Sequence, residues 1–183
     1  MTASQAYGVL MAGWVAWGLP FVPAAFRRRT AATRDTSARW GLLLQGASFF
    51  FVWTGVSRRV PPGAARVAGA LAFFATAILL SWTAVRALGR HWRIEAGLDA
   101  DHQLVRSGPY RVVRHPIYTS MLGMLVATGL LVAPWHLLAI AVAFAIAGTE
   151  IRVRVEDALL RSRFGETFEQ YRRTVPAYVP YVR

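Results

Sequence analysis

Uncharged stretches of roughly membrane-spanning length alternate with short basic segments along this chain. Three such stretches lie in the N-terminal part, at residues 6–26, 40–57 and 67–85. A helix needs about 20 apolar residues to cross the hydrocarbon layer of a bilayer, so this pattern predicts three transmembrane helices. Pro20 and Pro23 should kink the end of the first helix, because proline interrupts helical hydrogen bonding.

A fourth uncharged stretch, at residues 117–149, is too long for one helix and short for two full spans. Ala133 and Pro134 lie near its middle, which predicts a helical hairpin that turns there. We expect the second helix of this hairpin to continue beyond the membrane through the charged residues 150–163. It should end at Gly165, because glycine favours the backbone conformation that terminates helices.

The predicted fold class is all-α, an integral membrane protein with about five transmembrane helices, two of which form the hairpin. We expect a single membrane domain over residues 1–183, with three N-terminal transmembrane helices in residues 1–84 and a core in residues 85–183. The core would end in a C-terminal helix and a cap, residues 166–183, that is partly helical and partly extended. Composition supports this class, because 55% of the residues are hydrophobic and the mean hydropathy is +0.36, above the usual range of soluble domains.

The net charge of +12 comes from 21 arginines and no lysine, against nine acidic residues. A nucleic-acid-binding protein would gather such charge on one face or in one tail, whereas here the arginines flank the apolar stretches. The side that holds the C-terminus carries 18 of them, and the opposite side carries only Arg58, Arg59 and Arg66. The positive-inside rule then predicts a multi-pass protein of the cell (inner) membrane, with its N-terminus outside and its C-terminus in the cytoplasm.

The polar stretch at residues 106–118, directly before the hairpin, is the first candidate for binding chemistry. It is rich in arginine and contains His115. Because a hairpin returns the chain to the level at which it began, Arg114 and His115 should lie close to Arg152 and Glu156 on the last helix. The two segments would face the cytoplasm, where soluble charged cofactors are found.

Two charged pairs with a spacing of four residues lie on that last helix. Arg152 and Glu156 share one face, and Glu150 and Arg154 share another, with Asp157 also near Arg154. Both could be ion pairs that only stabilise the helix at the membrane boundary. Alternatively, one pair faces inward toward a bound ligand, because charged groups at membrane depth usually have a functional role.

The start of the hairpin offers further binding groups. Pro116 suits the first turn of a helix, where its missing N–H is not needed, and the free N–H groups of that turn could face an anion. Tyr118 would place its hydroxyl near the membrane interface. Gly108 and Pro109 predict a turn at which the backbone can approach a ligand closely.

No metal site is expected from the sequence. The chain contains no cysteine, which excludes disulfides and thiolate ligands. His91 and His102 are eleven residues apart and have no regularly spaced partner. We also find no glycine-rich phosphate loop and no nucleophile–base signature.

Two blocks of residues flank the hairpin. The first comprises Asp101-His102-Gln103-Leu104-Val105, Gly108-Pro109-Tyr110 and Arg114-His115-Pro116-Ile117-Tyr118, and the second comprises Arg152, Glu156-Asp157, Leu160, Phe164-Gly165, Phe168, Tyr171, Val175-Pro176 and Pro180. In content and order they resemble the isoprenylcysteine carboxyl methyltransferase family, over about residues 85–183. Two departures are Ser120, where the family often has glycine, and Asp157, where the family usually has a second glutamate.

The resemblance implies an integral membrane methyltransferase that takes a methyl group from S-adenosylmethionine, leaves S-adenosylhomocysteine and needs no metal. The cofactor would lie in a cytoplasmic pocket formed by the loop before the hairpin and the C-terminal helix and tail. Carried over by position, the catalytic residues would be Arg152 and Glu156, and the cofactor-binding residues would be His102, Gln103, Leu104, Val105, Gly108, Tyr110, His115, Pro116, Tyr118 and Glu156.

The expected methyl acceptor is a carboxylate of isoprenylcysteine type, on a lipid or on a prenylated small molecule or protein that enters from the membrane lipid. Residues 1–84 match the family only as generic spans, and we expect substrate choice to lie there. Nucleic acid is not an expected partner. The alternatives are a phospholipid or amine N-methyltransferase, an NADPH-dependent membrane reductase, and a catalytically silent membrane protein. An amine or phenol acceptor would have to lose a proton, with Glu156 or His115 as the candidate base.

Overall fold

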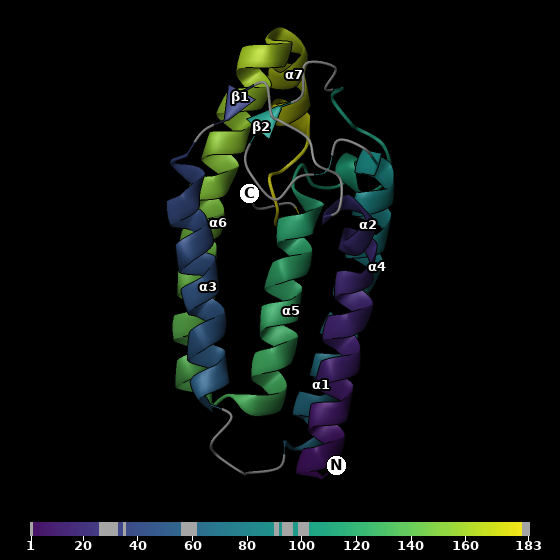
Figure 1. Ribbon diagram of the computed structural model, residues 1–183, viewed down its shortest axis with the longest axis vertical. Coiled ribbons are helices and arrows are strands. Elements are labelled where there is room, and N and C mark those ends of the chain that lie inside the picture. Colours follow the sequence, from purple (N-terminus) through teal and green to yellow (C-terminus); the bar gives the residue numbers. More distant parts are fainter. Residues whose placement is uncertain are drawn as a thin grey trace.

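The chain folds into a bundle of helices with one very small sheet. The computed structural model describes residues 2–25, 33–34, 36–55, 62–89, 92, 97–98 and 103–180. Within these residues the helices are α1 (Ala3–Gly18), α2 (Val22–Ala25), α3 (Ala38–Thr54), α4 (Ala64–Leu88), α5 (Pro116–Val132), α6 (Trp135–Phe164) and α7 (Glu166–Thr174). The longer helices run along one axis, and α7 lies at the end opposite to the N-terminus (Figure 1). The predicted all-α class is confirmed.

The first helical segment changes geometry where the prolines predicted a kink. α1 ends at Gly18, a 3-10 turn spans Leu19–Phe21, and α2 follows. Pro20 lies inside that turn, near the start of a helical segment, where the N–H that proline lacks is not needed. The backbone N–H of Val22 donates to the carbonyl of Leu19, so the chain continues in a helical direction.

A small antiparallel sheet joins two loops that are far apart in the sequence. β1 (Thr33–Arg34) pairs with β2 (Gly97–Leu98), with Thr33 opposite Leu98. The sheet lies at the α7 end of the bundle (Figure 1). It therefore brings the loop after the first helical segment to the same end as the segment before the hairpin, as the predicted topology requires.

The hairpin turns at Ala133 and Pro134, as predicted, between the end of α5 and the start of α6. Arg66 of α4 fixes this turn by donating from Nη2 to the carbonyl of Gly129 at 2.9 Å and to the carbonyl of Ala133. Its guanidinium also lies 4.9 Å from the ring centroid of Trp135. The Gly129 carbonyl also accepts the backbone N–H of Ala133, so Arg66 adds a second donor there and supplies one to the carbonyl of Ala133, just past the end of the helix.

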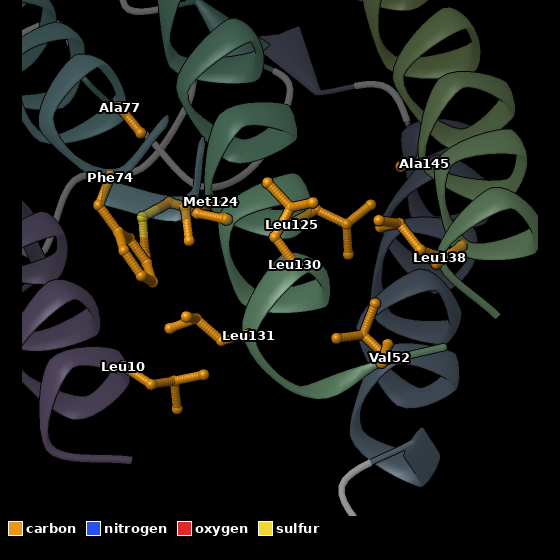
Figure 2. Packing of buried hydrophobic residues seen from close by; sticks show 14 residues of the cluster. Leu10, Val52, Phe74, Ala77, Met124, Leu125, Leu130, Leu131, Leu138 and Ala145 are labelled. Atoms are coloured by element: carbon orange, nitrogen blue, oxygen red, sulfur yellow. The ribbon is translucent and has the colours of Figure 1, made fainter. Parts of the chain in front are cut away.

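The apolar core is organised around α5. α4 packs along one side of α5, and α3 and α6 pair with each other on the other side (Figure 1). Figure 2 shows Phe74 of α4 beside Met124 of α5, with Val52 of α3 and Leu138 of α6 on the opposite side of α5. All four side chains are buried. α5 thus packs against apolar side chains on both sides. This packing fixes the position of the whole helix relative to α6, and its first turn is fixed with it.

Hydrogen bonds between side chains join α1 to α5 inside the bundle. The indole N–H of Trp14 donates to the hydroxyl of Thr128 at 3.2 Å, and that of Trp17 donates to the hydroxyl of Ser120 at 3.1 Å. A buried indole usually finds such an acceptor. The serine that departs from the family pattern therefore has a structural role in this chain, since a glycine could not accept this bond.

Among the described residues, two helices, α4 and α6, are long and apolar enough to cross a membrane, and α5 is a shorter apolar helix. Large apolar side chains also point outward from the bundle: Met11, Leu43, Phe50 and Leu79 are between 58% and 65% exposed. Extensive exposed apolar surface of this kind marks contact with membrane or with another protein.

The end of α6 and the tail follow the prediction. Gly165 ends α6 with φ +52°, a conformation that glycine adopts without strain. α7 then buries Phe168 and Tyr171, and the chain becomes extended at Val175. From there the tail runs back toward the start of α5, which places it beside the candidate site.

Candidate active site

The two polar segments flanking the hairpin meet at the start of α5. Arg114 and His115 immediately precede that helix, and Glu156 and Asp157 lie on α6. The carboxylate of Asp157 accepts from Arg114 Nη2 at 2.8 Å through Oδ2, and its Oδ1 lies 2.9 Å from His115 Nε2. The predicted approach of the two segments is therefore confirmed.

Asp157 corrects one sequence-based expectation. We expected it near Arg154, which lies three residues before it on the same helix. In the structure Asp157 turns toward Arg114 and His115, whereas Arg154 pairs with Glu150 at 3.5 Å. The side chain of Arg154 is 75% exposed, so the Glu150–Arg154 pair is the surface ion pair of the two that the sequence offered.

His115 lies between two carboxylates that are neighbours in the sequence. Its Nε2 faces Asp157, and its Nδ1 lies 3.4 Å from Glu156 Oε2. Burial alone would lower the pKa of His115. The hydrogen bonds and negative charges of Asp157 and Glu156 outweigh burial and raise that pKa from 6.5 to about 9. At neutral pH His115 is therefore an imidazolium that binds both acids.

Tyr118, one turn further into α5, connects Glu156 to Arg152. Its hydroxyl donates to Glu156 Oε1 and accepts from Arg152 Nε at 2.7 Å. The guanidinium carbon of Arg152 lies 5.3 Å from the Tyr118 ring centroid, and Arg152 Nη2 lies 3.6 Å from Glu156 Oε1. Arg152 is only 7% exposed. Of the two pairs, Arg152 and Glu156 is the one that faces inward.

The tail covers the first turn of α5. The backbone N–H of Arg114 donates to the carbonyl of Pro176 at 2.9 Å, and that of His115 donates to the carbonyl of Ala177 at 2.7 Å. The hydroxyl of Thr119 donates to the carbonyl of Tyr178 at 2.6 Å. Tail carbonyls therefore occupy the N–H groups of the two residues before the helix, and an anion facing the N–H groups of the first turn itself stays a prediction.

Arg114 also links the tail to the site, a contact that the sequence did not predict although it placed Arg114 near Arg152 and Glu156. Its Nη1 donates to the carbonyl of Arg172 at 3.2 Å and to the carbonyl of Val175. A second contact of the tail is the hydroxyl of Tyr178, which donates to Glu150 Oε1 at 2.7 Å. The position of Arg114 beside His115 in the motif was the available signal, but its tail partners are carbonyl groups, which carry no signature in a sequence.

The remaining predicted cofactor residues lie along the segment before α5. Gln103 is exposed and Leu104 and Val105 are half-buried. Gly108 has φ +59° at the start of a 3-10 turn, so the predicted turn is present, and close approach of a ligand to its backbone stays a prediction. Tyr110 is buried, and its carbonyl accepts from the Tyr171 hydroxyl at 2.5 Å.

Two other predicted positions complete this description. Pro116 is fully buried at the first position of α5, as predicted. His102 lies outside the described residues, so its predicted contact with the cofactor stays a prediction, and His91 also lies outside them. Among the described side chains no group of three or more histidines, aspartates and glutamates is arranged to hold a metal ion.

A family model described as the isoprenylcysteine carboxyl methyltransferase (ICMT) family matches residues 70–162, just over half of the chain. The matched region runs from α4 through the hairpin to the charged end of α6. It contains all the side chains that meet at the start of α5: Arg114, His115, Tyr118, Arg152, Glu156 and Asp157.

Individual relatives are similar over shorter regions. The chain is 32% identical over 84 residues to the protein-S-isoprenylcysteine O-methyltransferase of Schizosaccharomyces pombe, covering 46% of this chain and 36% of the relative. It is 32% identical over 107 residues to protein-S-isoprenylcysteine O-methyltransferase B of Arabidopsis thaliana, covering 57% and 54%. It is 37% identical over 81 residues to the cobalt-zinc-cadmium resistance protein CzcN of Cupriavidus metallidurans, covering 44% and 37%. The matched regions thus span about a third to about half of the length of these curated relatives.

Proposed function

Because the chain belongs to the isoprenylcysteine carboxyl methyltransferase family, we propose that it is a membrane enzyme that transfers a methyl group from S-adenosylmethionine to a lipophilic acceptor bearing a carboxylate. The observation that carries this proposal is the meeting of the two motif blocks. His115 and Tyr118 from the start of α5 contact Glu156, and Tyr118 also contacts Arg152. The motif blocks before and after the hairpin thus both contribute to one cluster.

Arg152 is the residue that would bind the acceptor carboxylate. A guanidinium is always charged and donates two parallel hydrogen bonds that match a carboxylate. The Tyr118 hydroxyl and ring fix its orientation. Positioning of reactants in this way is the main contribution an enzyme can make to a displacement between two bound groups.

Glu156 is the residue that would meet the cofactor. Its side chain is 26% exposed, whereas that of Asp157 is 14% exposed, so Glu156 is the more accessible of the two acids and can pair with a cation. The half-buried Leu104 and Val105 would offer apolar contacts, with Gly108 allowing close backbone approach. These groups fit an amphiphilic cation such as S-adenosylmethionine. When bound, it supplies a methyl group on a sulfonium, whose carbon–sulfur bond breaks as the acceptor oxygen forms the new bond.

The state of His115 argues against this residue as the base that an amine or phenol acceptor would need. A carboxylate is already ionised at neutral pH and needs no base, whereas an amine or phenol must lose a proton. With its pKa raised to about 9 by Asp157 and Glu156, His115 is already protonated at neutral pH. It therefore orients the two acids, and a reaction that required it as a base would have to work against this network.

The membrane arrangement that suits this function places the candidate site on the cytoplasmic side. Five helical segments, α1 with α2, then α3, α4, α5 and α6, would cross the inner membrane, with the N-terminus outside. The outward apolar side chains of these helices support lipid contact, and the hydropathy of α4 and α6 supports spanning. Residues 85–183 would form the methyltransferase core, and residues 1–84 would take part in acceptor choice.

Calorimetry on detergent-purified protein tests the cofactor directly. Wild type should bind S-adenosylmethionine with saturation and should not bind NADPH. Glu156→Gln should weaken this binding at least about tenfold, because a hydrogen bond to a charged group contributes about 1.5–3 kcal/mol. Glu166→Gln, an exposed carboxylate on α7, is the matched control and should bind as wild type does. Binding of NADPH alone would replace this proposal with a membrane reductase.

A further inference from the structure

Helix α3, which lies outside the region matched by the family model, touches the candidate site through a glycine. Gly41 in the first turn of α3 lies against Gly148 of α6. A Cβ built on Gly41 would be 2.6 Å from the Gly148 carbonyl oxygen, and one built on Gly148 would be 2.6 Å from the Gly41 carbonyl oxygen. The two backbones are therefore in direct contact at this level.

The stem of Arg152 crosses the same contact. A Cβ on Gly41 would lie 2.5 Å from Arg152 Cγ and 3.3 Å from the Arg152 backbone nitrogen. The far end of the same arginine contacts Tyr118 through Nε, at 2.7 Å. Arg152 is thus confined between the bare backbone of α3 and the aromatic ring on α5.

We propose that Gly41 is a positioning residue for Arg152: the backbone of α3 forms the wall against which the arginine stem packs, so that the guanidinium meets Tyr118 and Glu156 in one geometry. The catalytic significance of this role rests on the proposed methyltransferase function. Glycine weakens a helix interior relative to alanine, so its presence here is explained by a close approach that no other residue allows.

An alanine at this position would displace the middle of the arginine side chain. Two atoms lie in the way of the new Cβ: Arg152 Cγ, near the start of the stem, and the Gly148 carbonyl oxygen. Moving only the guanidinium cannot relieve the clash with Cγ. A misplacement of about 1 Å at a reacting group can lower rates by about 100-fold. We expect Gly41→Ala to lower kcat/KM for the acceptor about 10- to 100-fold while the Kd for S-adenosylmethionine changes less than about twofold.

Two other glycines provide matched controls. Gly46 lies on the same helix, and a Cβ there would meet nothing within 4 Å. A Cβ on Gly148 would have its nearest contacts with α3, the first being the Gly41 carbonyl oxygen, and no Arg152 side-chain atom is among them. Gly46→Ala therefore tests helix propensity, and Gly148→Ala tests helix packing without direct contact with the arginine.

The first readout needs no activity. In protein labelled with ¹⁵N-arginine, the Nε–H resonance of Arg152, assigned by its loss in Arg152→Lys, reports the hydrogen bond to Tyr118. It should shift or broaden in Gly41→Ala and stay in place in Gly46→Ala and Gly148→Ala. An unchanged resonance in Gly41→Ala would overturn the proposal, as would an equal change in Gly148→Ala, which would indicate general packing.

The second readout is the steady-state kinetics of methyl transfer to a farnesylated cysteine that has a free carboxylate. The change in kcat/KM for this acceptor is compared with the change in the Kd for S-adenosylmethionine. Loss of kcat/KM in Gly41→Ala with cofactor affinity retained supports positioning, whereas equal loss of both contradicts it. If Gly41→Ala does not fold, the double variant Gly41→Ala/Arg152→Ala should give more folded protein than Gly41→Ala does, because Cγ is gone, although the contact of the new Cβ with the Gly148 carbonyl oxygen remains. An equal yield of folded protein from the two variants overturns the proposal. A wild type that neither binds S-adenosylmethionine nor transfers methyl would refute the proposed function, and the resonance would still decide the role of Gly41.

Discussion

Arg152 on α6 and Tyr118 on α5 contact each other in two ways. Arg152 Nε donates to the Tyr118 hydroxyl at 2.7 Å, and the guanidinium carbon lies 5.3 Å from the ring centroid. The same hydroxyl donates to Glu156. One hydroxyl on α5 therefore orients both members of the charged pair on α6, and the site is a product of the whole hairpin.

Removing this hydroxyl should lower the rate of methyl transfer more than it lowers the stability of the fold. In Tyr118→Phe the ring still stacks on His115, at the 5.7 Å centroid distance of the wild type, but Arg152 loses its acceptor and Glu156 loses a donor. A misplacement of about 1 Å at a reacting group can lower rates by about 100-fold, so we expect the loss of this orientation to lower kcat/KM about tenfold or more. Steady-state methyl transfer measures this, and Tyr7→Phe on α1 is the control. Wild-type kinetics in Tyr118→Phe would show that the hydroxyl does not orient the pair.

Replacing Asp157 should change the titration of His115. The hydrogen bond and charge of Asp157 help to raise the pKa of His115 to about 9. Asp157→Asn removes that charge, so the pKa of His115 should fall toward its ordinary value. NMR titration of the histidine signals, with His115 assigned by substitution, measures the change. Glu169→Gln on α7 serves as the control, and an unshifted titration in Asp157→Asn would contradict the hydrogen-bond assignment.

The raised pKa also predicts how stability depends on pH. A histidine whose pKa is higher in the folded state contributes stability that is fully present below about 6.5 and is lost as pH rises through about 9. The shift corresponds to about 3 kcal/mol at most. The Tm of wild type in detergent should therefore exceed that of His115→Gln near neutral pH, and the difference should shrink at alkaline pH. A difference that stays constant across this range would mean that His115 is not charged in the folded protein.

Arg66 should stabilise the hairpin from the end opposite to the site. Arg66→Ala removes the donor that serves the carbonyls of Gly129 and Ala133 and the contact with Trp135. Loss of hydrogen bonds from a charged donor costs about 1.5–3 kcal/mol, so Tm should drop by several degrees while cofactor affinity per folded molecule stays unchanged. The control is Arg173→Ala, at an exposed position of α7. A Tm equal to wild type in Arg66→Ala would contradict a role in holding the turn.

Much of the hairpin could be predicted because its signals are local. An uncharged stretch interrupted by Pro134 fixes the turn, and Gly165 marks the end of α6. The four-residue spacing of Arg152 and Glu156 places them on one face, and the hairpin topology brings that face toward His115. Each of these inferences uses either residues close together in the sequence or a single topological step.

Other contacts could not be predicted because they join segments that share no pattern. The spacing of Asp157 from Arg154 suggested a pair on one helix, but its partners come from the start of α5. The two-residue strands are too short to show a period. Gly41 and Gly46 look alike in the sequence, and only the packing of α3 on α6 distinguishes the glycine that contacts Arg152.

Transfer of labelled methyl from S-adenosylmethionine to a farnesylated cysteine, in detergent or reconstituted membranes, tests the central claim most directly. Wild type should form a product that releases labelled methanol in alkali, as a carboxyl methyl ester does, and Arg152→Ala should not. A labelled product that survives alkali would show methylation of nitrogen or of a phenol. No labelled product from folded wild-type protein that binds S-adenosylmethionine, with this acceptor or a membrane lipid extract, would contradict the assignment of a lipophilic carboxylate as the acceptor.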